Sequence, residues 1–170
     1  MFKKLNGVTL SHRKKTRKMP AVLMPSPSTV TIPMNMNIGN PANPCVKVGD
    51  DVKVGQLIGE ADGVVSAPVH ASVSGKVKAI SPILTCTGAE VLAVTIESDG
   101  EMAVSGTCVA PNITDYDSFI EAVRASGAVG LGGAGFPTAV KLDVKDTSRI
   151  EEIIIMAPSV NLILQSTPEQ

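Results

Sequence analysis

The sequence predicts a mainly β protein, a small sandwich or barrel that is followed by one helix and a glycine-rich loop. Short alternating or β-branched runs follow one another between residues 46 and 98, and the turns that separate them contain Gly, Asp and Ser. Helical periodicity appears only near residue 116, directly before the loop. The composition is 44% hydrophobic but only 2% aromatic, which predicts an aliphatic core.

The first segment, residues 1–19, is basic. No acidic residue precedes Asp50, whereas this segment holds seven Lys or Arg. We expect it to be solvated, and contact with an anionic membrane surface or an acidic partner is the alternative. Nucleic-acid binding is not expected, because no aromatic residues are interleaved with the charges. We find no apolar run long enough to span a membrane and no signal peptide, so a cytoplasmic protein is expected.

Residues 19–44 carry six prolines, which disfavour helix. Val30-Thr31-Ile32 is expected to lie along the sheet as a strap, with a free linker as the alternative. The strands that follow are expected over residues 46–48, 52–54, 56–60, 64–69, 76–80 and 90–97.

The spacing of the cysteine and histidine residues in the sequence does not indicate a metal centre. Cys45, Cys86 and Cys108 are odd in number, and their spacing matches no zinc or iron–sulfur motif. We interpret them as buried or incidental thiols. His70 has no Cys or second His near it in the sequence, so it is expected to be a packed or surface residue rather than a ligand or base.

The predicted helix begins near Tyr116 and ends before Gly127, a typical C-terminal stop. Ser118-x-x-Glu121 is a candidate capping box. The apolar positions share one helical face, which is expected to face the core; they are Tyr116, Phe119, Ile120 and Val123.

Four glycines in six positions form the loop at residues 130–135. Such a loop exposes successive backbone N–H groups and can make a concave anion site. A glycine-rich surface turn is the alternative. The Gly-x-Gly-x-x-Gly pattern lacks the preceding strand of a dinucleotide fold, and no Walker motif follows.

The full string of residues 130–138, followed by Val140-Lys141-Leu142, resembles the flavin loop of the C subunits of Rnf electron transport complexes. It is also similar to the loop in the flavin subunit of NADH-quinone oxidoreductases, but Leu131 stands where those usually carry Arg. The resemblance implies that FMN lies against the loop and that Lys141 reaches its anionic group, with a solvated Lys141 as the alternative. The implied cofactor-binding residues are Gly130, Gly132, Gly133, Ala134, Gly135 and Lys141.

Residues 48–60, with later matches through residue 77, resemble the barrel-sandwich hybrid fold of lipoyl and biotinyl carriers. Carriers attach their cofactor to Lys, and residues 60–66 contain none, which argues against a swinging arm. Residues 64–75 look more like the N-terminal hybrid domain of Rnf C subunits. We therefore expect a hybrid domain over residues 20–105 and the start of an α/β FMN-binding domain over residues 106–155.

The resemblance implies electron transport between NADH, FMN and iron–sulfur centres in a membrane-bound ferredoxin:NAD oxidoreductase that pumps ions. Its other subunits would be partners, at the inner face of the cell membrane. The ligands of the family's two 4Fe-4S clusters are not present in this chain, so little turnover is expected from it alone. The alternative is a non-enzymatic docking module that binds neighbouring subunits.

Residues 150–155 are β-branched and are expected to form a strand. Rnf C subunits then continue Asn-Gly-Ala-Glu-Cys-Glu-Pro-Tyr-Ile, whereas residues 156–164 read Met-Ala-Pro-Ser-Val-Asn-Leu-Ile-Leu. DNA that encodes the family motif can encode this second string when it is read from one base later. We therefore expect residues 156–170 to be a frameshifted, non-native tail. A deliberate truncation is the alternative, and the DNA beyond the Ile155 codon decides between them.

Overall fold

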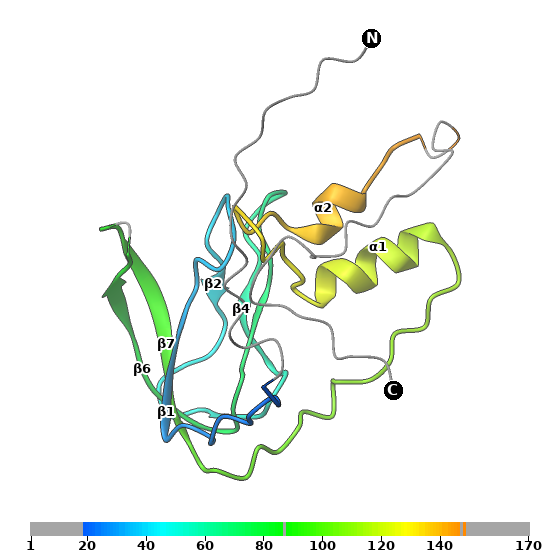
Figure 1. Cartoon of the computed structure of the whole chain (residues 1–170). Coiled ribbons are helices and arrows are strands. Elements are labelled where there is room, and N and C mark those ends of the chain that lie inside the picture. Colours follow the sequence, from blue (N-terminus) through cyan, green and yellow to red (C-terminus); the bar gives the residue numbers. More distant parts are fainter. Residues whose placement is uncertain (1–18, 87, 147, 149–170) are drawn as a thin grey trace. The chain divides into compact units, whose positions relative to one another are not determined.

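The computed structural model describes residues 19–86, 88–146 and 148 (Figure 1). The described residues from Pro25 onward belong to one compact unit, and residues 19–24 belong to another. Residues 1–18 of the basic segment, the strand expected over residues 150–155 and the tail at 156–170 lie outside the described residues.

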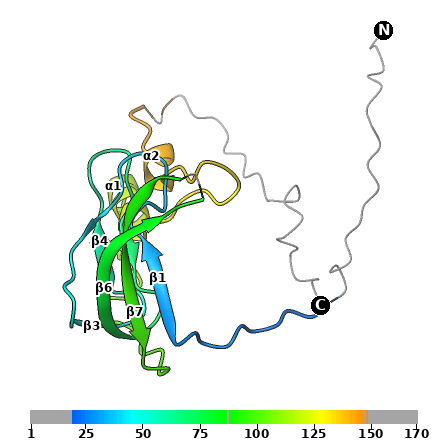
Figure 2. The same ribbon diagram turned by 90° about the vertical axis from the view of Figure 1, so that its left-hand side faces the viewer.

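Two antiparallel sheets form the β-domain, which we define as residues 25–105. In the larger sheet the strands are ordered β1 (Thr29–Pro33), β7 (Glu90–Ser98), β6 (Gly75–Leu84) and β3 (Asp51–Val52). The smaller sheet is ordered β2 (Asn43–Pro44), β4 (Leu57–Glu60) and β5 (Val69–His70). Figure 2 shows the larger sheet curling along β6 and β7. The mainly β prediction is confirmed.

An aliphatic core lies within this domain. Met34, Ile58, Val77, Val94 and Ile96 are completely buried. Each such side chain contributes about 1.5–3 kcal/mol relative to an exposed one. The aliphatic core that the composition predicts is therefore confirmed.

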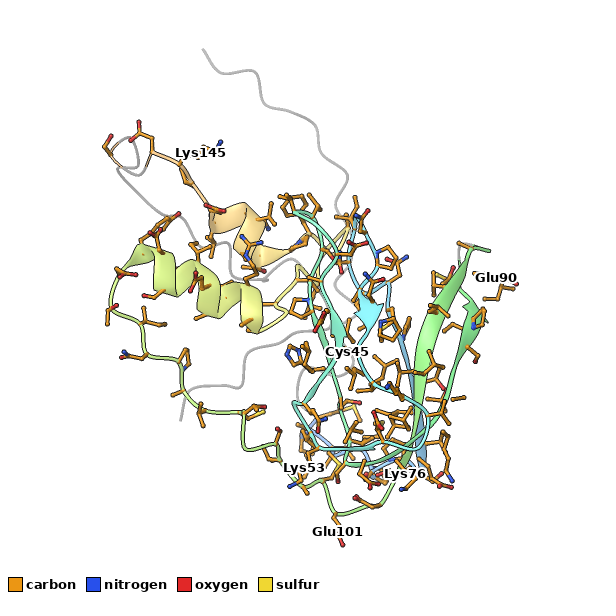
Figure 3. The ribbon with its side chains drawn as sticks, turned by 180° about the vertical axis from the view of Figure 1, so that it is seen from behind. Cys45, Lys53, Lys76, Glu90, Glu101 and Lys145 are labelled. Atoms are coloured by element: carbon orange, nitrogen blue, oxygen red, sulfur yellow. The ribbon has the colours of Figure 1, made fainter. Side chains whose placement is uncertain are left out.

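The β6–β7 hairpin is the longest element of the sheet. Its register runs from Gly75↔Ser98 to Leu84↔Glu90. The neighbouring strands cover only part of it, because β3 pairs with β6 at Gly75 and Lys76 and β1 reaches β7 only as far as Ala93. Figure 3 places Glu90 and Lys76 at opposite ends of the hairpin. The distal part, residues 81–92, therefore projects as an arm, and Leu84 on it is 72% exposed.

The strap prediction is confirmed. Strand β1 contains Val30-Thr31-Ile32 and pairs with β7 throughout, from Thr29↔Glu97 to Pro33↔Ala93. The hydroxyls of Thr31 and Thr95 are 3.1 Å apart across this pair. Edge placement suits the proline-rich segment, since an edge strand tolerates a missing N–H donor.

Two strand predictions are wrong because local side chains take the backbone hydrogen bonds. Residues 46–48 lead into a turn in which the Asp50 carboxylate accepts from the Lys47 N–H at 2.8 Å. Residues 64–69 are strand only at Val69, and Val64 is 75% exposed. In that loop the Ser66 hydroxyl accepts from the Asp62 N–H at 2.9 Å. Short polar side chains commonly compete with a sheet ladder in this way.

A polar cluster closes the end of the β6–β7 hairpin. The buried Ser74 hydroxyl donates to the Asp99 carboxylate at 2.6 Å and accepts from the Ala103 N–H at 2.9 Å. Asp99 also accepts from the Glu101 N–H at 2.9 Å. These hydrogen bonds hold the pKa of Asp99 below its ordinary value, and the bond from Ser74 has the largest effect.

The Asp99 cluster predicts acid sensitivity. A carboxylate whose pKa is depressed by folding stabilises the protein above its unfolded pKa, near 3.8, and loses this contribution as pH falls through the folded pKa. Asp99→Asn retains an acceptor but cannot titrate, so its free energy of unfolding should fall less between pH 5 and pH 3 than that of wild type. Urea unfolding across this range measures the difference. Asp62→Asn is the control, because the Asp62 carboxylate accepts no hydrogen bond within the described chain. Equal slopes for wild type and Asp99→Asn would contradict the prediction.

The helix prediction is confirmed in its bounds, but the predicted cap is wrong. Helix α1 (Tyr116–Ala125) is capped by Asp115, whose carboxylate accepts from the Ser118 N–H at 2.8 Å. Ser118 occupies the third helical position of this capping box instead of starting its own. Gly127 follows with φ +68, as the stop signal predicts. A second helix, α2 (Thr138–Leu142), lies beside α1 (Figure 1).

The apolar face of α1 is less buried than expected. Ile120 is buried, whereas Tyr116 and Phe119 are exposed. The Tyr116 hydroxyl instead bonds to the end of α2 and the residues after it, donating to the Leu142 carbonyl and accepting from the Val144 N–H at 3.0 Å. A tyrosine can cover apolar surface while its hydroxyl stays hydrogen-bonded, which explains this departure from a simple core face.

Candidate functional site

The glycine loop connects α1 to α2, and the two ends of the loop are hydrogen-bonded to each other. Val129 and Pro137 form an antiparallel bridge. The Gly130 N–H donates to the Phe136 carbonyl at 3.0 Å, and the Thr138 N–H donates to the Ala128 carbonyl at 2.9 Å. The loop is therefore held at its base while its tip, residues 131–134, lies exposed.

The tip presents unpaired backbone donors. Within the described chain, the N–H groups of residues 131–134 donate to no backbone or side-chain acceptor. No heavy atom lies within 4 Å of a Cβ built at Gly133, and Leu131 is 86% exposed. Gly132 and Ala134 complete this tip. Bare, unpaired N–H groups of this kind can be satisfied by an anion.

One segment of the β-domain contacts the end of the loop. The Ile38 N–H donates to the Gly135 carbonyl at 3.3 Å. Gly135 has φ +67, and a Cβ there would lie 3.3 Å from both the Asn37 Cα and the Met36 carbonyl oxygen. A side chain at this position would be strained by the positive φ, and its Cβ would push the neighbouring backbone away by a few tenths of an ångström, so both conformation and space favour glycine here.

Asn37 sits in this contact segment with an unpaired acceptor. The residue is 7% exposed, and its Nδ2 donates to the Ile38 carbonyl at 2.8 Å. Its Oδ1 is buried and has no hydrogen-bond partner among the described residues. A buried unpaired amide oxygen costs about 1–3 kcal/mol, so this position can accept a donor from a ligand or water.

Lys141 lies exposed on α2 and makes no ion pair within the described chain. The acidic residue nearest to it in sequence, Asp143, pairs with Arg124 at 3.5 Å. The Lys141 ammonium is therefore available to an anionic ligand near the loop, although no described contact joins it to residues 131–134.

Sequence reasoning missed a cavity beside the loop. It has a volume of about 310 Å³. Residues of β1, Met36, four residues in and around β5, and two residues that precede the loop, Gly127 and Val129, line it. His70 lies in its wall, and burial lowers the pKa of the His70 imidazole below its ordinary value. Gly127 packs against this wall, since a Cβ there would overlap the Pro68 carbonyl oxygen. Periodicity gives no signal for a cavity that forms between distant segments.

The described residues contain no other candidate centre. No group of three or more His, Cys, Asp or Glu among them could hold a metal ion. The three cysteines are free and exposed, so of the two interpretations given for them the incidental thiol holds and the buried one does not. At Cys45, partial burial and the charge of Glu60 raise the pKa of the thiol, which disfavours the reactive thiolate. Among the described helices, none has the length and hydropathy needed to cross a bilayer.

Comparison with known proteins decides the family. Residues 2–101 match the RnfC barrel-sandwich hybrid domain, which is more than half of the chain. The chain belongs to the RnfC family. The barrel-sandwich hybrid prediction is thus confirmed, as is the resemblance to Rnf C subunits.

Relatives in the RnfC family extend the similarity beyond this domain. The chain is 41% identical over 154 residues to the C subunit of the Na(+)-translocating ferredoxin:NAD(+) oxidoreductase complex of Acetobacterium woodii, covering 88% of this chain and 34% of the relative. It is 36% identical to the C subunit of the ion-translocating oxidoreductase complex of Pseudomonas aeruginosa, covering 85% and 19%. It is also 36% identical to the C subunit of the proton-translocating ferredoxin:NAD(+) oxidoreductase complex of Clostridium ljungdahlii, covering 84% and 32%. The matches thus span about a third of these relatives or less.

Proposed function

We propose that this chain is the N-terminal part of an RnfC-type subunit that binds FMN and takes part in electron transport within an ion-translocating ferredoxin:NAD oxidoreductase complex. Its partners would be the other subunits of that complex, at the inner face of the cell membrane. The relatives are subunits of such complexes by name. The single observation that carries the proposal is the exposed loop tip at residues 131–134, whose N–H groups have no acceptor in the described chain.

The residues present fit the phosphate end of a flavin mononucleotide. The tip offers several unpaired N–H donors. Gly133 has no side chain, and no described heavy atom lies within 4 Å of its Cβ position, so a phosphate group has room there. Lys141 supplies a cation on the following helix, and the Asp143 charge is already paired with Arg124. Phosphate groups are commonly held by such a combination of backbone donors and one lysine.

A bound flavin supplies the chemistry that accepts electrons as hydride from a nicotinamide and releases them singly. The role of this chain's own residues is to bind and orient. Gly130 and Gly135 close the base of the loop and keep its tip in place, while Gly132, Gly133 and Ala134 admit the phosphate to the backbone. In this proposal the iron–sulfur steps belong to parts of the relatives that lie outside the matched region.

Titration with FMN tests the proposal. Purified protein is expected to quench flavin fluorescence with a dissociation constant in the micromolar range, about −8 kcal/mol. Inorganic phosphate in excess should compete if the loop holds the phosphate group. Absence of quenching by a protein whose circular dichroism shows an intact β-domain would refute flavin binding.

That negative result would favour a docking module, the second candidate function. Its specific support is the arm of residues 81–92, which neither β1 nor β3 covers. Leu84 and Leu92 are exposed on this arm. Exposed apolar side chains on a projecting hairpin are typical of surfaces that another polypeptide covers.

A further inference from the structure

We propose that residues 13–24, which we call the basic-apolar segment, bind directly to the surface of an anionic phospholipid bilayer. The partner is a membrane surface whose negatively charged headgroups lie over an apolar interior. The inference rests on the proposed function only for the location at a membrane face, and it does not depend on flavin binding.

The first half of the segment supplies positive charge. Five of the six residues at positions 13–18 are Lys or Arg, and no acidic residue occurs before Asp50. No neighbour in the sequence therefore neutralises these cations. Clusters of roughly four to eight cations bind anionic lipid surfaces, and each cation near the surface strengthens binding by about fivefold.

The second half of the segment supplies apolar side chains in contact with solvent. Met19, Val22, Leu23 and Met24 are all largely exposed, and Leu23 is 96% exposed. Residues 19–24 form no helix or strand, so these side chains do not pack within a regular element. Single exposed apolar residues are ordinary, whereas a continuous exposed run is typical of a surface that another molecule covers.

The direct succession of charge and apolar surface favours lipid as that molecule. An acidic protein surface would pair with the cations and leave the apolar side chains in water, and an apolar groove would leave the cations unpaired. A bilayer accommodates both halves, because Lys and Arg can remain among the headgroups while apolar neighbours enter the acyl boundary. The backbone of residues 19–24 would stay at headgroup level, since non-helical backbone is not tolerated in the hydrocarbon.

The charge of the remaining chain confines the contact to its N-terminal end. Residues 25–170 hold all sixteen acidic residues but only eight of the fifteen Lys and Arg. An anionic surface therefore attracts the basic-apolar segment and repels the rest of the chain.

Vesicle binding tests the proposal on the full chain. Purified protein is mixed with vesicles of phosphatidylcholine, alone or with phosphatidylglycerol, and bound protein is measured by sedimentation. We expect binding to the anionic vesicles only, and weaker binding as the salt concentration rises. Lys14→Gln combined with Lys15→Gln should weaken this binding by about 25-fold. Leu23→Ser should weaken it by about tenfold, because its side chain no longer gains from leaving water.

Two control variants make the same changes outside the segment. Lys53→Gln combined with Lys145→Gln removes the same charge from two exposed lysines. Leu84→Ser removes a leucine that is 72% exposed on the arm, where residues 81–92 contain no Lys or Arg. Neither control should change vesicle binding. Circular dichroism should be unchanged for the segment variants, because residues 13–24 lie outside the β-domain.

The possible outcomes separate this inference from flavin binding. Equal binding to both kinds of vesicle, binding to neither, or equal losses in the segment and control variants would overturn the lipid contact. Binding to immobilised polyglutamate but to neither vesicle would assign the cations to an acidic protein instead. Protein that binds FMN but no vesicles overturns this inference alone. Protein that binds anionic vesicles but no FMN overturns flavin binding alone.

Discussion

Gly75→Ala is expected to destabilise the β-domain by on the order of 4 kcal/mol or more, a loss comparable to the total stability of many small domains. Gly75 begins β6 with φ +146, a conformation that L side chains rarely adopt. A Cβ at this position would overlap the Glu97 carbonyl oxygen and lie 2.9 Å from the Ser98 Cα. These are backbone atoms of the paired strand β7, so no flexible side chain can move aside. Denaturant unfolding followed by circular dichroism measures the effect.

Alanine substitutions at two other glycines distinguish the two causes of this loss of stability, which are backbone strain and steric overlap. Gly100 has φ +77 but nothing within 4 Å of its Cβ position, so Gly100→Ala should cost only conformational strain, about 1–2 kcal/mol. Gly106 also has open space, and no positive φ restricts it, so Gly106→Ala should be neutral. If Gly75→Ala were as stable as Gly100→Ala, the overlap with β7 would not be the cause of the expected loss.

Gly133→Asp is expected to weaken FMN binding by about 100-fold or more while leaving the fold unchanged. Open space around Gly133 means that the new side chain meets no described atom of the protein. Its carboxylate would, however, stand where the phosphate is proposed to bind. Two like charges about 5 Å apart near a protein surface repel by roughly 3 kcal/mol, which corresponds to this factor. Titration of the variant with FMN measures the loss.

Gly133→Asn is the control for this prediction, since it has the same shape as Asp without the charge. It should weaken FMN less than the aspartate does, and the gap between the two variants should narrow at high salt. Equal affinities of both variants for FMN would place the phosphate away from the loop tip.

Most strands and the main helix could be predicted from local patterns. Expected strands at residues 76–80 and 90–97 lie within β6 and β7, because β-branched alternation and Gly turns act over a few residues. The true length of β6, which continues to Leu84, was not predicted. Its last residues include Pro82, and only pairing with β7 keeps them in the sheet.

The errors have a common physical origin in side-chain hydrogen bonds. Asp50 and Ser66 bind backbone N–H groups and turn the chain where β-branched residues favoured strand. Asp115 caps α1 where Ser118 was expected to do so. A short polar side chain can accept a hydrogen bond from any of several nearby N–H groups. Which bond forms depends on the backbone geometry, and sequence spacing does not specify that geometry.

For the candidate site, the sequence by itself determined the bare loop at residues 130–135, because a run of glycines exposes its backbone in any fold that leaves the loop at the surface. It also determined the family through motifs in that loop and in the hybrid domain. Tertiary structure alone decided the neighbours of the loop. Met36, Asn37 and His70 are remote from it in the chain, and only the packing of the β-domain brings them to its base. Contacts between remote segments depend on how whole elements pack, so no local pattern announces the cavity that they enclose.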